Sequence, residues 1–210
     1  MKKKLLFLSF AFLFCLFTLT GCSLSFDLGG GKTITNTEPL TIEAGATATE
    51  IAEEYLDAVV TVMVEDGSGN PISFGSGVAV YAGGYIATNY HVINTAVNSN
   101  IFELQVYLNT ETTGYDAEIL WYNQSLDLAI IRCDYYNIPF VKMADRWIEG
   151  SKHLRILEQV ITIGTPIDFG LQNTASIGYI SSAEYRYATS DTNLYEDLIQ
   201  HSAAISNGNS

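Results

Sequence analysis

Three short segments carry side chains that could do chemistry, and they supply a histidine, an aspartate and a serine in that order: His91, Asp127 and Ser210. A serine hydroxyl is a weak nucleophile at neutral pH, so it needs a neighbouring imidazole that takes its proton as it attacks a carbonyl. Histidine can take and return a proton near pH 7. A carboxylate can hold that imidazole in one tautomer and stabilise the imidazolium. The three residue types together suit nucleophilic attack on a carbonyl without a metal or cofactor.

The sequence around each residue resembles the HtrA/Deg branch of the trypsin-like serine proteases. The histidine block reads GSGVAVYAGGYIATNYHVI over residues 75–93, the aspartate block reads LDLAII over 126–131, and the serine block reads IQHSAAISNGNS over 199–210. The resemblance runs from about Glu54 to Ser210. It implies a chymotrypsin/trypsin-like double β-barrel and a serine endopeptidase acting on polypeptide substrates, particularly unfolded or misfolded envelope and secreted proteins.

The resemblance also implies the role of each site residue. His91 is the general base, Asp127 orients it, and Ser210 is the nucleophile. The backbone N–H groups of Gly208 and Ser210 form the oxyanion hole. His153 and His201 match no catalytic position of the family.

The match departs from the family pattern at and near its end. The family continues Gly-Gly-Pro-Leu after the serine, where this sequence stops, and Ser202 stands where an aspartate is common. We therefore expect an incomplete second barrel and an inactive fragment of a serine endopeptidase. A non-catalytic peptide-binding lipoprotein and a structural surface lipoprotein on the same fold remain alternatives.

The elements expected to position these residues are mostly strands. Runs rich in Val, Ile and Tyr alternate with Gly, Asn and Asp, which predicts an all-β fold. Six short strands before Cys133 indicate a small closed barrel or a sandwich; they lie at residues 58–64, 77–81, 85–88, 104–108, 115–121 and 128–133. A partial second barrel is expected over about 159–210, with strands at 159–163, 174–181 and 198–202 and a polar loop at 184–193. A short amphipathic helix is expected at 49–56.

The first residues indicate targeting rather than folding. Lys2 to Lys4 precede the uncharged apolar run from Leu5 to Leu19, which is short for a bilayer span of about 20 residues. The run ends in Leu-Thr-Gly-Cys at Cys22, which resembles the bacterial lipobox. We expect residues 1–21 to be a lipoprotein signal peptide, 22–48 a flexible tether and 49–210 the protease domain. The domain would then lie outside the cytoplasm, anchored to the membrane through a lipid on Cys22.

Composition narrows the choice of partners and cofactors. The net charge is −13, and three of the ten basic residues lie in the leader, so the folded part repels phosphate backbones and nucleic-acid binding is not expected. Cys133 is the one cysteine beyond Cys22, so no internal disulfide is expected, and it is most simply a small buried side chain. No metal-ligand spacing is present, and an oligomer is possible but not indicated by the sequence.

Overall fold

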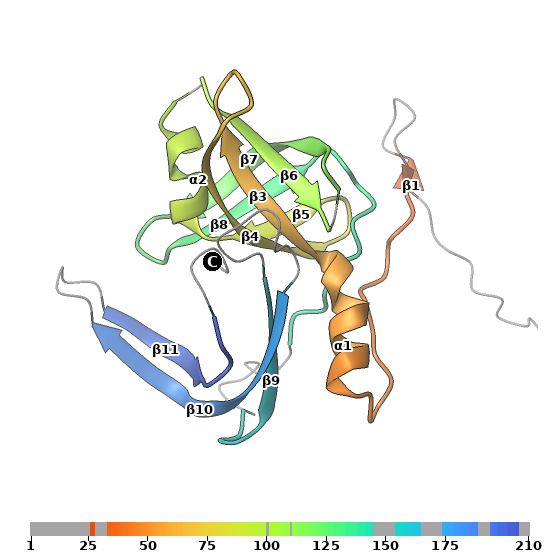
Figure 1. The fold of residues 1–210 in the computed structure, drawn as a ribbon, viewed down its shortest axis with the longest axis vertical. Helices are drawn as coiled ribbons and strands as arrows, with labels where there is room; N and C mark the ends of the chain where they lie inside the picture. The colour runs from red at the N-terminus through yellow and green to blue at the C-terminus, as the bar shows by residue number, and fades with distance from the viewer. Residues whose placement is uncertain are drawn as a thin grey trace, which may run out of the picture.

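The computed structural model describes residues 26–27, 33–99, 101–109, 111–144, 154–164, 174–188 and 194–205. Six antiparallel strands of the described chain form a closed barrel in the order β3-β4-β5-β8-β7-β6 (Figure 1). The strands are β3 (Val59–Glu65), β4 (Pro71–Tyr81), β5 (Tyr85–Thr88), β6 (Glu103–Leu108), β7 (Gly114–Asn123) and β8 (Leu128–Cys133).

Aliphatic side chains fill the barrel because alternate residues of each strand point inward. Val60, Val62 and Val64 of β3 are all buried and belong to the same apolar cluster as Ile131. Gly77 allows the close approach of strands here: a Cβ at this position would lie 2.7 Å from the nearest atom of Ile86. The glycine is therefore required by packing.

The buried cysteine behaves as the sequence indicates. Cys133 ends β8, is completely buried and belongs to the core cluster. Burial disfavours the charged thiolate and raises the pKa of Cys133 to about 11. The thiol is accordingly an inert packing group.

Within the described residues, two α-helices flank the barrel. α1 (Ala48–Tyr55) is the helix expected at 49–56, and it begins with a capping box in which Thr47 and Glu50 exchange hydrogen bonds. A short 3-10 turn, η1 (Leu56–Ala58), leads from it into β3. The sequence reasoning missed α2 (Tyr90–Val97), since an eight-residue segment between two strands carries little helical periodicity.

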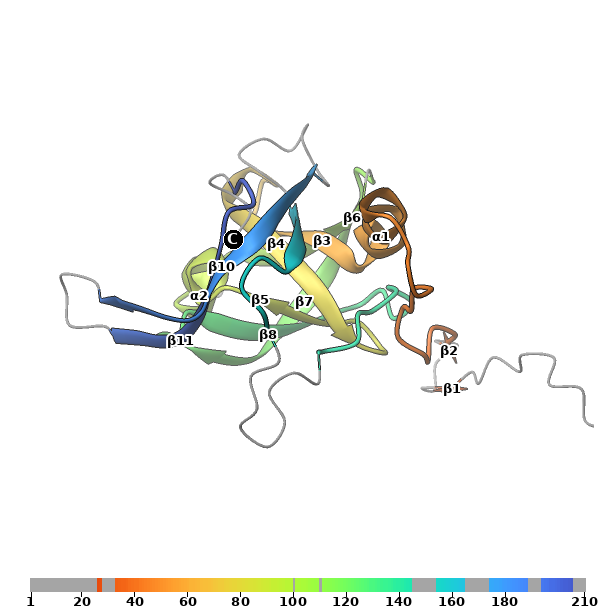
Figure 2. The ribbon, with the colours of Figure 1, turned by 90° about the horizontal axis from the view of Figure 1, so that it is seen from below.

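A second antiparallel sheet follows the barrel, with strand order β11-β10-β9. It consists of β9 (Gln159–Gly164), β10 (Thr174–Ala188) and β11 (Leu194–His201). Figures 1 and 2 place it on one side of the barrel, with β9 near β3 and β4. A closed barrel followed by a partial second sheet confirms the expected fold class.

The polar loop expected at residues 184–193 is wrong in its first half. β10 continues to Ala188 and pairs with β11, with Tyr185 opposite Leu198 and Tyr187 opposite Tyr195. Tyrosine is enriched in strands. The polar residues between them hid that pattern from the sequence reading.

Residues 33–40, which precede α1, already contact other parts of the fold. β1 (Phe26–Asp27) pairs with β2 (Thr33–Ile34), and Ile34 is buried. The backbone N–H of Leu40 donates to the carbonyl of Phe140 at 2.7 Å, in the connection after β8. Cys22 lies outside the described residues. No helix within the described ranges is long and apolar enough to cross a membrane.

Candidate active site

The helix that the sequence did not reveal is the element that holds His91. Asn89 is its N-cap residue, and its side chain makes no capping hydrogen bond. Val92 and Ile93 of the first turn are fully buried in the barrel core, and they fix the helix against the barrel. His91 therefore points outward, with half of its side chain exposed.

Asp127 is placed by the turn between β7 and β8. The turn is closed by a hydrogen bond from the Asp127 N–H to the carbonyl of Gln124 at 3.2 Å, and the Leu126 N–H donates to Asn123 Oδ1 at 3.0 Å. Asp127 has φ = +52°, in the left-handed region that aspartate tolerates better than most side chains. This conformation turns the carboxylate back toward α2.

The structure brings His91 and Asp127 together through two direct contacts. His91 Nδ1 lies 2.7 Å from Asp127 Oδ2, and the backbone N–H of His91 donates to Asp127 Oδ1 at 2.9 Å. A carboxylate can only accept, so Nδ1 carries a hydrogen, and in the neutral imidazole Nε2 is then the acceptor. Both carboxylate oxygens are used, which fixes the orientation of the ring as well as its tautomer.

Asn89 is a third member of this arrangement, which the sequence reasoning missed. Its Nδ2 donates to the Asp127 carbonyl oxygen at 2.9 Å and lies 3.3 Å from Asp127 Oδ2. The side chain thus holds both the backbone and the carboxylate of Asp127. Its position two residues before His91, in the TNYH block, was the available signal, but a single asparagine there suggests a helix cap first.

The serine block is described only up to Ile205. The Ser202 N–H donates to the Tyr179 carbonyl, and the Tyr179 N–H donates to Ser202 Oγ, both at 3.0 Å. Ser176 Oγ donates to the carbonyl of Ala204 at 2.6 Å. These bonds attach the end of the block to β10. Gly208 and Ser210 lie outside the described residues.

His201 is not part of the His91–Asp127 pair. His201 lies in β11, and its Nδ1 is buried without a hydrogen-bond partner within the described chain. His153 lies outside the described residues. No group of three or more His, Cys, Asp or Glu side chains that could hold a metal occurs in the ranges that the structure describes.

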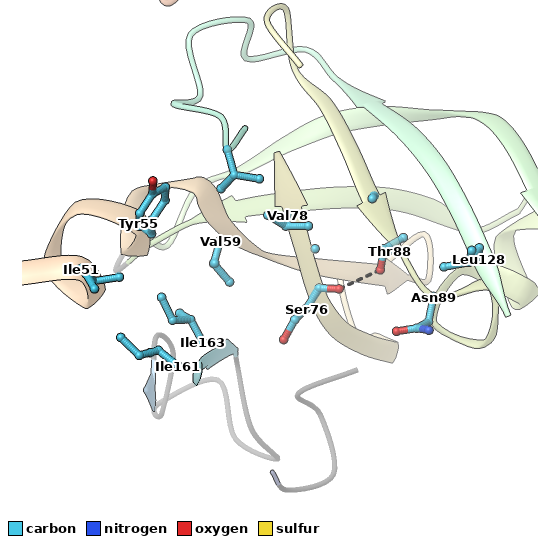
Figure 3. A pocket seen from close by; sticks show the side chains of 13 residues that line it. Ile51, Tyr55, Val59, Ser76, Val78, Thr88, Asn89, Leu128, Ile161 and Ile163 are labelled. Carbon is cyan, nitrogen blue, oxygen red and sulfur yellow. Dashed lines mark hydrogen bonds between the residues drawn. The ribbon is translucent and has the colours of Figure 1, made fainter. Parts of the chain in front are cut away.

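An apolar cleft of about 460 Å³ runs between the barrel, α1 and β9. Figure 3 shows Asn89 and Leu128 at one end of it and Ile51 and Tyr55 at the other, with Ile161 of β9 on the opposite wall. Two of its lining residues are thus neighbours of the pair: Asn89 bonds Asp127, and Leu128 follows it. His91 and Asp127 themselves are not among the residues that line the cleft.

Comparison with known proteins gives consistent matches over this region. The family model for a trypsin-like peptidase domain matches residues 75–210. The magnetosome formation protease MamE of Paramagnetospirillum magneticum is 35% identical over 138 residues, which is 66% of this chain and 18% of that protein.

Two further relatives come from other organisms. Protease Do-like 1, chloroplastic, of Arabidopsis thaliana is 36% identical over 141 residues, or 67% of this chain and 30% of that protein. A probable periplasmic serine endoprotease, DegP-like, of Rickettsia prowazekii is 35% identical over 141 residues, or 66% of this chain and 25% of that protein. The matched region therefore spans less than a third of the length of each of these relatives.

Proposed function

Since this chain belongs to the trypsin-like peptidase family, and within it to the HtrA/Deg branch, we propose that it is a serine endopeptidase with His91 as its general base. The observation that carries the proposal is the 2.7 Å contact between His91 Nδ1 and Asp127 Oδ2. In the neutral imidazole this contact places the hydrogen on Nδ1 and leaves Nε2 as the acceptor, and half of the side chain is open to solvent. That is the state a base needs before it accepts a proton from a nucleophile.

The reaction would proceed in two displacement steps. Nε2 of His91 takes the proton of Ser210 Oγ as that oxygen bonds to the substrate carbonyl carbon. The carbonyl oxygen becomes an oxyanion, which the N–H groups of Gly208 and Ser210 stabilise. His91 then gives its proton to the leaving amine, and the peptide bond breaks to leave an acyl-serine. Water, activated by the same imidazole, hydrolyses that ester and restores the serine.

Asp127 contributes by holding the ring and balancing its charge. The carboxylate receives the Nδ1 hydrogen and faces the imidazolium that forms during each step. Its second oxygen is occupied by the His91 N–H at 2.9 Å. The carboxylate is thus positioned before substrate arrives and needs little reorganisation during the reaction.

We further propose that the substrates are unfolded or misfolded polypeptides outside the cytoplasm. The DegP-like relatives are named as periplasmic endoproteases, and the apolar cleft beside the pair suits exposed apolar segments. Anchoring through lipidated Cys22 would keep the enzyme at the membrane surface. A Cys22→Ser variant should lose labelling by a radioactive fatty acid and stay unprocessed; a labelled variant would refute the anchor.

The catalytic proposal is tested by casein hydrolysis with the full-length gene product. His91→Ala and Ser210→Ala should each lower kcat by about 10⁴–10⁶-fold, and the double variant should lose little more because the residues act as a unit. Asp127→Asn should cost about 10⁴-fold. His153→Ala is the matched control, since it removes an imidazole that matches no catalytic position.

A serine-directed phosphonate gives a second readout of the same site. It should label Ser210 in the native protein and fail to label the His91→Ala variant. Cleavage that survives both single substitutions would contradict the proposal. A complete absence of cleavage with intact peptide binding would favour the peptide-binding alternative.

A further inference from the structure

The hairpin that carries Asp127 has several exposed apolar side chains near its end. Large apolar side chains are exposed by 45–56% on both sides of the aspartate: Leu120, Trp121, Tyr122, Leu126 and Leu128. The first three lie near the end of β7 and Leu128 begins β8, so the turn between the strands contributes only Leu126 to this set. In a chain of net charge −13, such a concentration of exposed apolar surface indicates a contact with another molecule. We call residues 120–128 the hairpin tip.

The hairpin tip is connected to the candidate base by a stacked aromatic pair. The rings of Tyr122 and Tyr90 lie with their centroids 5.3 Å apart at an interplanar angle of 29°. Tyr90 directly precedes His91 in α2, so the two Cα atoms are about 3.8 Å apart. The stack is therefore one residue along α2 from the candidate base.

A local irregularity in β7 decides which face of the sheet Tyr122 occupies. The register of β7 against β8 shifts between Ile119 and Trp121, after which Tyr122 lies opposite Ala129. Ala129 faces the barrel core and is buried, whereas Tyr122 is 45% exposed. The bulge increases the local twist. Tyr122 thus lies on the core-facing side of β7 but near the end of the strand, where it remains partly exposed and stacks on Tyr90.

We propose, building on the proposed function, that Tyr90 and Tyr122 are specificity-determining residues that bind a bulky apolar side chain of the substrate, best an aromatic one. Tyrosine offers a large rigid contact at a low entropic cost, and aromatic rings favour offset or edge contacts with one another. An extended substrate advances by about 3.3 Å per residue. The bound side chain therefore belongs to a residue within about four positions of the scissile bond.

Continuity with the candidate active site selects the substrate as the occupant. Tyr90 and His91 are consecutive, and Leu126 and Leu128 flank Asp127 in the chain. This adjacency in the chain favours the polypeptide held for attack at His91 as the occupant. A second copy of the chain bound to the same tip would compete with substrate, and the test below separates the two.

The test measures peptide binding without cleavage, so that it does not depend on catalysis. The full chain with His91→Ala is titrated into fluorescein-labelled extended peptides, and binding is followed by fluorescence anisotropy. Each peptide carries Phe, Arg or Ser at one of eight successive positions in an otherwise constant Ala/Ser sequence. Phe at one position should strengthen binding by about three- to tenfold over Ser.

Two further substitutions assign that preference to the stack. Tyr122→Ala should abolish the preference for Phe, and Tyr122→Phe should restore it. Tyr81→Ala is the matched control, because Tyr81 is 66% exposed and lies at the opposite end of the β4–β5 pair from Thr88. It should leave the preference unchanged. Melting curves of each variant show whether it remains folded.

The outcomes distinguish this inference from the proposed function. It is overturned if no position prefers Phe, if Arg binds better than Phe, or if the preference survives Tyr122→Ala. It is also overturned if Tyr122→Ala changes the sedimentation coefficient but not peptide binding, since the tip would then join copies of the chain. If the protein without substitutions does not cleave casein, that result counts against the catalytic proposal alone and leaves the binding preference to be tested.

Discussion

Replacing Asn89 with alanine tests whether the candidate base is held as the structure describes. The substitution removes the hydrogen bond to the Asp127 carbonyl at 2.9 Å and the longer one to Asp127 Oδ2 at 3.3 Å. It removes no helix-capping bond, because the Asn89 side chain makes none. The effect therefore reports on Asp127, whose φ of +52° must be maintained by its neighbours.

The magnitude follows from these two bonds. A part-buried hydrogen bond contributes about 0.5–1.5 kcal/mol to stability, and the longer bond should contribute at the lower end of that range. We expect Asn89→Ala to lower the free energy of unfolding by about 1–2 kcal/mol. In a domain of this size that corresponds to a decrease in Tm of about 3–6 °C.

Urea denaturation and calorimetry measure the stability, and proton NMR measures the site. The low-field resonance of the hydrogen between His91 Nδ1 and Asp127 should broaden or weaken in the variant. If the protein turns over casein, kcat should fall while KM changes little, since Asn89 acts through Asp127 and not on substrate.

Asn98→Ala provides the matched control for this experiment. Asn98 ends the same helix and donates to the Asn94 carbonyl at 2.8 Å, far along the chain from Asp127. It should lower stability slightly and leave the low-field resonance unchanged. The reasoning would be refuted if Asn89→Ala changed neither stability, within about 0.3 kcal/mol, nor the resonance.

Three other expectations concern the barrel itself. Gly84→Ala should lower the free energy of unfolding by about 2–4 kcal/mol, because Gly84 has φ = +80° and an added Cβ would lie 2.6 Å from the Cys133 carbonyl oxygen. Gly67→Ala is the control in the same denaturation experiment, because an added Cβ at Gly67 would meet no atom within 4 Å. Cys133, with its pKa raised to about 11 by burial, should react with a thiol reagent only after denaturation, and equal labelling of native protein followed by peptide mapping would contradict this. Burial, together with the hydrogen bond to Glu65, raises the pKa of Tyr107 to about 12. In the unfolded chain the phenol of Tyr107 ionises near pH 10. Its contribution to stability is therefore complete below about pH 10 and is lost as the pH rises to about 12. Tyr107→Phe should flatten the fall in the free energy of unfolding over that interval, and an unchanged slope would count against this prediction.

The sequence by itself determined the fold class and identified His91 as the candidate base with Asp127 beside it. Alternating Val, Ile and Tyr runs predict strands because side chains of a strand alternate between its faces. That local rule sufficed for all six strands of the barrel, although β4 begins at Pro71, earlier than the expected residue 77. His91 and Asp127 were recognised because their neighbours match a family pattern.

Elements without a strong local pattern could not be predicted from the sequence as well. α2 is too short for a clear helical period, and the extension of β10 to Ala188 rests on pairing with β11. Such pairing depends on residues distant in the chain, which outweigh local preference in sheets. The contacts of residues 33–40 with the connection after β8 arise in the same way.

Only the tertiary structure decided how the site is held and what surrounds it. Asn89 and Asp127 are 38 positions apart in sequence, yet the side-chain amide of Asn89 holds both the backbone carbonyl and the carboxylate of Asp127. The stack of Tyr90 on Tyr122 likewise requires α2 and the β7–β8 hairpin to meet at one end of the barrel. A sequence records which side chains are present; closing the barrel determines which of them lie within hydrogen-bonding or stacking distance, because both interactions act over only a few ångströms.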